Sequence, residues 1–149
     1  MNRDFVEMLS ALSDHEVEYL VVGAHALAAH GHVRATKDLD VWIRPTRDNA
    51  ARAHRALDSF GAPLANLSVD DLSRPGTVFQ IGVAPLRIDV LTRIDGVTFD
   101  EAWPAKVPAK LGGVATFVLS REHLIKNKRA CGRLQDLADV ERLERAEED

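Results

Sequence analysis

Apolar positions along the chain switch between helical and strand spacing, which predicts a mixed α/β fold. The spacing of three or four residues near the N-terminus predicts an amphipathic helix whose buried side chains are Phe5, Met8, Leu9 and Leu12. The run from 18 to 22 is short and almost wholly apolar, so it predicts a buried strand. Gly23 follows directly and is expected to turn the backbone out of that strand.

An alanine-rich stretch and an acidic stretch come next. Ala24 to Ala29 predicts a helix that packs closely because its side chains are small, and Gly31 is expected to end it. After a loop, Lys37 to Ile43 predicts a second strand. Side chains alternate between the two faces of a strand, so Asp38 and Asp40 should project together on one face.

The middle of the chain predicts a crossover helix followed by two strands. Thr46 is placed to cap a helix that runs to Phe60 and closes at Gly61. A weaker helix follows, with Ser68 and Asp71 spaced as a capping box.

Two strands, 77–83 and 86–91, are then predicted around a short turn at Ala84-Pro85. On the second of these strands Arg87, Asp89 and Leu91 share a face. Asp89 can therefore point the same way as the first acidic pair.

The last third predicts a helical turn at 99–103, a hairpin of 106–111 with 114–119, and two helices that begin at about Ser120 and are separated by Gly132. Crossover lengths and alternation together predict an α/β (α+β) fold in which a mixed, twisted sheet carries helices mainly on one face. We expect one domain, 1–149, whose C-terminal helices start from about 120.

Composition and charge indicate the class of protein and its cellular compartment more than its chemistry. A chain of 149 residues fits one ordinary globular domain. Its net charge of −4 does not favour binding to nucleic acid over a broad electrostatic surface. The single cysteine, Cys131, fits a reducing cytoplasm. No apolar run reaches the roughly 20 residues of a membrane span, and the N-terminus has no signal-peptide core. We therefore expect a cytoplasmic protein with no membrane partner.

The three aspartates carry the chemical signal. Adjacent carboxylates repel one another unless a cation lies between them, and an oxygen-rich cage of Asp38, Asp40 and Asp89 would suit Mg²⁺ or Mn²⁺. A glycine turn that opens a helix presents backbone amides to an anion. Together these features suit a nucleoside triphosphate. The alternative is an edge strand whose acids simply face solvent.

These residues resemble the DNA polymerase β-like nucleotidyltransferases, whose motif is a glycine and a small residue, then Asp-x-Asp, then a third acid on another strand. Here the matching residues are Gly23-Ala24, Asp38-Leu39-Asp40 and Asp89. The chain is more similar still to small bacterial AbiEii-type proteins, through the pattern from Gly31 to Asp40 and a helical segment from 126 to 139.

The resemblance implies a metal-dependent transfer of a nucleoside monophosphate from a triphosphate to a hydroxyl on RNA, a protein or a small molecule. It implies Asp38, Asp40 and Asp89 as catalytic metal ligands. It also implies a nucleotide-binding set comprising Gly23, Ala24, Arg34, Thr36 and Lys126. The acceptor could be tRNA or a partner protein, and the protein could belong to a toxin–antitoxin pair.

Several of these residues also have an explanation that involves no function. Arg34 could contact substrate or only pair with the acidic strand, and the cluster Lys126, Lys128, Arg129 and Arg133 could be a solvated face paired with Asp136 and Asp139. His25 and His30 are five residues apart, a spacing that does not favour a zinc pair. A β-branched residue at Gly23 should block triphosphate binding with little loss of fold.

One position departs from the family pattern. Ala24 stands where a serine or glycine is usual, so only its backbone amide is left to contact a phosphate. Three functions therefore remain open: an active nucleotidyltransferase, a catalytically silent binding module with the same fold, and an α/β domain whose acids are surface decoration.

Overall fold

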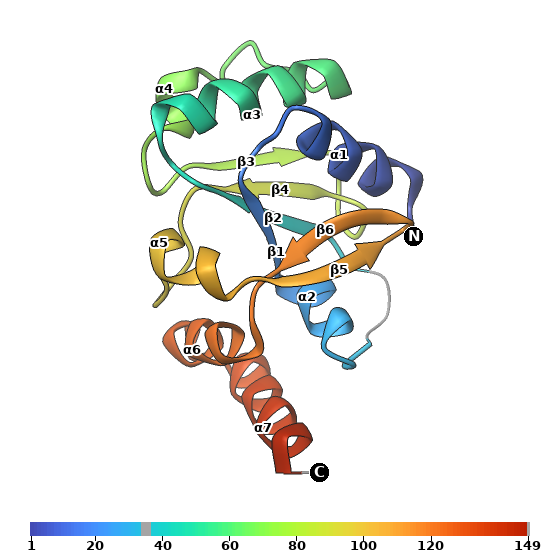
Figure 1. Cartoon of the computed structure of the whole chain (residues 1–149), viewed down its shortest axis with the longest axis vertical. Helices are drawn as coiled ribbons and strands as arrows, with labels where there is room; N and C mark the ends of the chain where they lie inside the picture. The colour runs from blue at the N-terminus through green and yellow to red at the C-terminus, as the bar shows by residue number, and fades with distance from the viewer. Residues whose placement is uncertain (34–36, 149) are drawn as a thin grey trace.

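The computed structural model of the protein describes residues 1–33 and 37–148, and its centre is a six-stranded mixed sheet (Figure 1). The strands lie in the order β3-β4-β2-β1-β6-β5. Neighbours pair antiparallel except for β2 with β4 and β1 with β6, which are parallel. The strands are β1 (Tyr19–Val22), β2 (Leu39–Ile43), β3 (Val78–Ile81), β4 (Ile88–Leu91), β5 (Val107–Leu111) and β6 (Val114–Val118).

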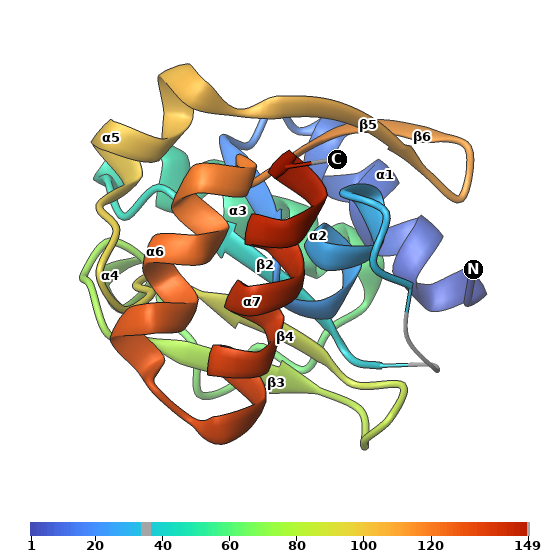
Figure 2. The same ribbon diagram turned by 90° about the horizontal axis from the view of Figure 1, so that it is seen from below.

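Helices flank the sheet on both sides. Figures 1 and 2 show α1, α3 and α4 on one side of the strands and α6 and α7 on the other. The helices are α1 (Arg3–Asp14), α2 (Gly23–Ala29), α3 (Arg47–Phe60), α4 (Val69–Leu72), α5 (Phe99–Ala102), the 3-10 turn η1 (Trp103–Ala105), α6 (Arg121–Cys131) and α7 (Leu134–Glu148). The predicted mixed sheet is confirmed, and the expectation of helices on one face holds for α1, α3 and α4.

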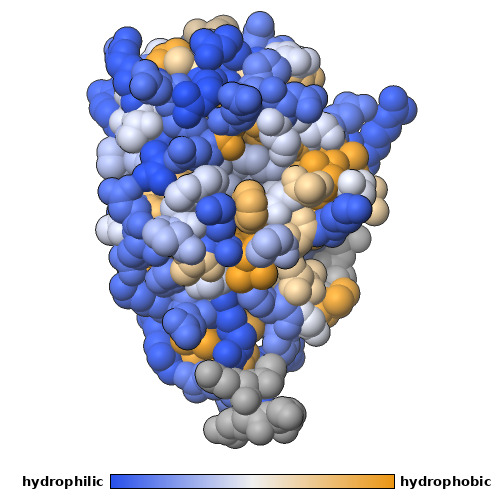
Figure 3. Space-filling view, in the orientation of Figure 1, coloured by the Kyte–Doolittle hydropathy of each residue, from blue (hydrophilic) through white to orange (hydrophobic). Residues whose placement is uncertain are grey.

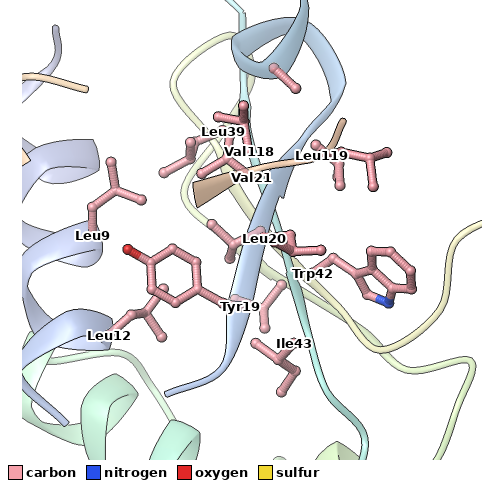
Figure 4. Close-up of a cluster of buried hydrophobic side chains, with 14 of the residues drawn as sticks. Leu9, Leu12, Tyr19, Leu20, Val21, Leu39, Trp42, Ile43, Val118 and Leu119 are labelled. Atoms are coloured by element: carbon pink, nitrogen blue, oxygen red, sulfur yellow. The ribbon is translucent and has the colours of Figure 1, made fainter. Parts of the chain in front are cut away.

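The core lies against both faces of β1. All four residues of this strand are buried, because a strand covered on both sides has no solvent-facing positions. Figure 4 shows Leu9 and Leu12 of α1 beside Tyr19, whereas Trp42 and Leu119 lie on the other side of the β1–β2 pair. The Tyr19 hydroxyl remains satisfied, because Ser13 Oγ lies 2.9 Å from it and Thr116 Oγ1 donates to it at 2.8 Å.

Local sequence signals account for most element ends. Gly61 takes the left-handed conformation at the end of α3, and Gly132 does the same between α6 and α7. Ser120 caps α6 by accepting from the His123 amide. The acidic strand begins at Leu39, later than the expected Lys37, so Asp38 directly precedes β2.

The face shown in Figure 3 is predominantly hydrophilic, with small apolar patches between the polar regions. Within the described parts of the chain, no helix combines the length and the apolar character needed to cross a membrane.

Candidate functional site

Register brings the predicted acids together. β2 and β4 are parallel neighbours in which Asp40 lies directly opposite Asp89, and Asp38 directly precedes β2. Residues opposite each other on adjacent strands point to the same face of the sheet. Asp89 is only 9% exposed, and Asp38 and Asp40 are partly buried. The three carboxylates therefore form one cluster that is largely withdrawn from solvent.

Arg87 is the cation of this cluster. Its Nε donates to Asp89 Oδ1 at 2.7 Å and its Nη2 to Asp89 Oδ2 at 3.2 Å, which makes a bidentate pair. The same Nη2 lies 3.3 Å from Asp38 Oδ2, and the backbone amide of Arg87 donates to Asp38 Oδ1 at 2.9 Å. Arg87 thus bridges two of the three acids and offsets part of their repulsion.

The repulsion among the three carboxylates that Arg87 does not offset acts on Asp40. Burial raises its pKa to about 7, and the nearby charge of Asp89, a hydrogen bond with Asp89 and the charge of Asp38 add to this effect. Arg87 lowers the pKa but does not cancel the rise. Near neutral pH, the Asp40 carboxyl is therefore partly protonated, because burial and its neighbouring carboxylates disfavour its charge when no other cation separates them.

Gly23 lies against Asp40. Its φ is +67°, a conformation that favours glycine, and a Cβ added there would be 2.3 Å from Asp40 Oδ2. Gly23 and Ala24 form the first turn of α2, which has no side-chain cap hydrogen bond. The predicted glycine turn therefore lies beside the carboxylate cluster. The expectation that Gly23→Val would leave the fold intact is wrong, because both the backbone conformation and the contact with Asp40 require glycine.

Lys126 is not brought to the acids by any contact in the described part of the chain. Its Nζ lies 2.6 Å from Glu101 Oε1, and this hydrogen bond is the largest cause of a fall in the Glu101 pKa to about 2. Arg34 and Thr36, the other predicted nucleotide contacts, lie outside the described residues. His25 Nε2 contacts the Lys37 carbonyl and His30 Nε2 contacts the Leu119 carbonyl, so the two imidazoles have different partners.

Part of the basic cluster on the last two helices is buried. Lys128 is 8% exposed and its Nζ lies 2.9 Å from Asp139 and 3.5 Å from Asp136, while Arg133 contacts Asp136 at 2.6 Å. The pairing with the two aspartates is confirmed for Lys128 and Arg133, whereas Lys126 pairs with Glu101 and Arg129 with Glu144. The predicted solvated face is wrong for Lys128, because the α6–α7 pair encloses it.

The residue types at the carboxylate cluster fit a divalent cation. Three carboxylates supply the hard oxygen ligands that Mg²⁺ prefers, and two of them, Asp40 and Asp89, are close enough to hydrogen bond to one another. However, over residues 1–33 and 37–148 no group of three or more acidic, histidine or cysteine side chains is arranged to hold a metal ion as it stands. In this structure Arg87 lies between Asp38 and Asp89 and supplies positive charge there.

Sequence reasoning missed the role of Arg87. The signal was present, since Arg87 precedes Asp89 by two residues and alternation places both on one face. Its bond to Asp38 could not be read from the sequence, because it depends on the parallel pairing of β2 with β4.

Comparison with known proteins supports the fold. The sequence matches no protein-family model, and no curated protein matches it. The structure is similar to that of a candidate nucleotidyltransferase from Thermotoga maritima, with a TM-score of 0.58, 17% identity, and coverage of 96% of this chain and 89% of that one.

Two further solved structures have the same fold. ANT(2″)-Ia, solved in complex with adenylyl-2″-tobramycin, gives a TM-score of 0.56 at 15% identity over 93% of this chain and 84% of that one. An antigenic nucleotidyltransferase-like protein from Paracoccidioides brasiliensis gives 0.52 at 15% identity over 94% and 74%. The chain therefore has the nucleotidyltransferase fold.

Proposed function

We propose that the protein is a metal-dependent nucleotidyltransferase that moves a nucleoside monophosphate from a nucleoside triphosphate to a hydroxyl acceptor. The observation that carries this proposal is the pairing of Asp40 with Asp89 beside Asp38 and Gly23, on the fold of solved nucleotidyltransferases. A buried acidic cluster costs stability, so its presence beside a tight glycine turn favours a functional site over surface decoration.

Asp38, Asp40 and Asp89 would hold Mg²⁺ or Mn²⁺. When bound, the ions would neutralise the triphosphate and make the attacking hydroxyl more acidic. Two changes in the chain's own residues would have to come first. Arg87 must release Asp38 and Asp89, and Asp40 must lose its proton, before all three carboxylates are free to bind.

The transfer itself follows from these positions. The acceptor oxygen forms a bond to the α-phosphorus while the bond from that phosphorus to the pyrophosphate oxygen breaks. In this proposal Asp89 would take the proton of the attacking hydroxyl, and the backbone amides of Gly23 and Ala24 would donate hydrogen bonds to phosphate oxygens.

The narrower assignments rest on the sequence resemblance. We infer an AbiEii-type protein that works in the cytoplasm, with ATP or another triphosphate as donor, and with tRNA or a partner protein as acceptor. A place in a toxin–antitoxin pair would follow from the same resemblance.

A silent binding module is the second candidate. Ala24 lacks the hydroxyl that a serine at this position would offer, and Arg87 already pairs with two of the acids. Such a module would bind a nucleotide without turning it over.

Labelled transfer distinguishes the two candidates. The purified protein is incubated with each α-labelled nucleoside triphosphate, Mg²⁺ or Mn²⁺, and a cell extract. If the protein is an active enzyme, wild type transfers the label to an acceptor, and the rate of transfer falls by orders of magnitude in Asp38→Asn and Asp40→Asn. Binding without any transfer supports the module, and neither binding nor transfer contradicts both.

A further inference from the structure

Arg87 pairs with the same carboxylate oxygens that a divalent cation would need. Its Nε and Nη2 donate to the two oxygens of Asp89 at 2.7 and 3.2 Å, and the same Nη2 lies 3.3 Å from Asp38 Oδ2. A metal ion held by both acids would draw on these oxygens, because carboxylates are the ligands that Mg²⁺ and Mn²⁺ prefer. The guanidinium group and a metal ion therefore compete for Asp38 and Asp89.

The side chain of Arg87 can leave the acids without any change in the main chain. Its backbone amide donates to Asp38 Oδ1 at 2.9 Å, and its carbonyl accepts from the Leu39 amide at 3.0 Å. These two bonds do not involve the guanidinium group. The side chain is 31% exposed, so one side of it is open to a ligand from solvent. Arg87 thus has a fixed backbone and an accessible charge.

Displacement of the guanidinium group by a metal ion alone is unfavourable. Within the described part of the chain, the carboxylates that pair with Arg87 are Asp38 and Asp89. A metal ion on both acids would take these partners away and would add a second positive charge beside the first. A triphosphate removes the conflict, because it is strongly anionic and a guanidinium group binds phosphate oxygens through two parallel hydrogen bonds.

We propose that Arg87 couples metal binding to triphosphate binding. It holds Asp38 and Asp89 in the nucleotide-free protein, and it pairs with a phosphate group instead when metal and triphosphate bind together. This role rests on the proposed function and adds a form of regulation to the same site. Coupling between two ligands is reciprocal, so each ligand tightens the binding of the other by the same factor. Removal of the Arg87 charge should therefore change the two affinities in opposite directions.

The test measures binding of each ligand and does not depend on catalysis. Mn²⁺ affinity without nucleotide is measured from the electron paramagnetic resonance signal of the free ion. We expect Arg87→Met to bind Mn²⁺ at least about tenfold more tightly than wild type, because no internal cation competes for the acids. The α,β-methylene analogues of the four nucleoside triphosphates, which cannot release pyrophosphate, are then titrated by calorimetry at saturating Mn²⁺. The analogue that binds wild type should bind Arg87→Met at least about tenfold more weakly.

Two further variants separate this role from a general effect of charge or of folding. Arg93→Met removes an arginine that pairs with Asp95 and not with the three aspartates, so both affinities should equal those of wild type. Arg87→Lys keeps a positive charge without the bidentate contact, so both affinities should shift in the same directions as in Arg87→Met but less. Thermal unfolding verifies that each variant is folded, and Arg87→Lys replaces Arg87→Met in the comparison if the latter is not.

The coupling is overturned if Mn²⁺ binds the Arg87 variants no more tightly than wild type. It is also overturned if Mn²⁺ binding tightens while the affinity for the triphosphate analogue stays unchanged. Failure of the proposed function has a different signature, because no analogue then binds wild type at any concentration of Mn²⁺. That result would contradict the triphosphate site and the coupling together, whereas the first two would contradict the coupling alone.

Discussion

Asp40 holds its proton to an unusually high pH because burial and two neighbouring acids disfavour its charge. Its pKa of about 7 in the folded protein compares with an ordinary value of 3.8. Between these values the folded state binds more protons than the unfolded state, so stability falls as the pH rises through this window. A group of this kind is useful where a cation must later replace a proton, and costly where none ever does.

Asp40→Asn should remove that pH dependence. Without metal, we expect the free energy of unfolding to rise by about 1–3 kcal/mol at pH 8 and to change little near pH 4. Urea unfolding at several pH values measures this. Asp58→Asn, at an exposed carboxylate on α3, should follow wild type throughout. A constant offset between Asp40→Asn and wild type at every pH would contradict the assigned pKa.

Arg87→Met should destabilise the metal-free protein, because Asp38 and Asp89 lose their shared cation. The side chain of Arg87 is 31% exposed, so we expect a loss of stability that is smaller than for a fully buried pair and larger than for an exposed one. Mg²⁺ should restore much of this loss in thermal unfolding. Arg74→Met, which breaks an exposed pair with Asp71, should cost under about 1 kcal/mol and show no rescue. Equal responses of the two variants to Mg²⁺ would argue against a cation exchange at the acids.

Gly23→Ala tests the turn beside Asp40. We expect a loss of about 2–4 kcal/mol, against about 1 kcal/mol for Gly61→Ala, which has a positive φ but open space around its Cβ position. Combining Gly23→Ala with Asp40→Ala should recover at least about 1 kcal/mol, because the contacted carboxylate is gone. Additive losses in the double mutant, measured by chemical unfolding, would show that the two residues do not touch.

At the scale of elements, the α6–α7 pair depends on an internal charge network. Lys128→Met leaves Asp136 and Asp139 buried without the Lys128 charge, so we expect a loss of about 2–4 kcal/mol. Lys126→Met removes only an exposed pair with Glu101 and should cost under about 1 kcal/mol. Thermal unfolding compares the two. A milder effect at Lys128 than at Lys126 would show that the network does not hold the helices together.

Elements were predictable where a local signal controls them. Apolar spacing and the glycines at 61 and 132 predicted the helices, and alternation predicted that Asp38, Asp40 and Asp89 face one side. The burial of Lys128 was not predictable, because helical spacing shows which residues share a face but not what covers that face. The role of Arg87 depends on which strands pair, and pairing brings together residues far apart in the chain.

At the scale of the whole molecule, the sheet order explains why the acids meet. β2 lies between β1, which leads into Gly23, and β4, which carries Asp89. This order places the glycine turn and the third acid on opposite sides of the strand that bears Asp40. Its likeness to solved nucleotidyltransferases at 15–17% identity is thus a likeness of backbone arrangement, and the chemistry rests on the particular side chains held there.

The most direct test of the account is calorimetric titration of each nucleoside triphosphate into wild type and Asp40→Asn, with and without Mg²⁺. We predict that wild type binds at least one triphosphate only when Mg²⁺ is present, more tightly at pH 8 than at pH 6 because Asp40 must lose its proton. Asp40→Asn should lose this response, and Asp58→Asn should keep it. Binding that is absent in wild type, or that persists in full in Asp40→Asn, would contradict the assignment of the three aspartates as a metal–triphosphate site.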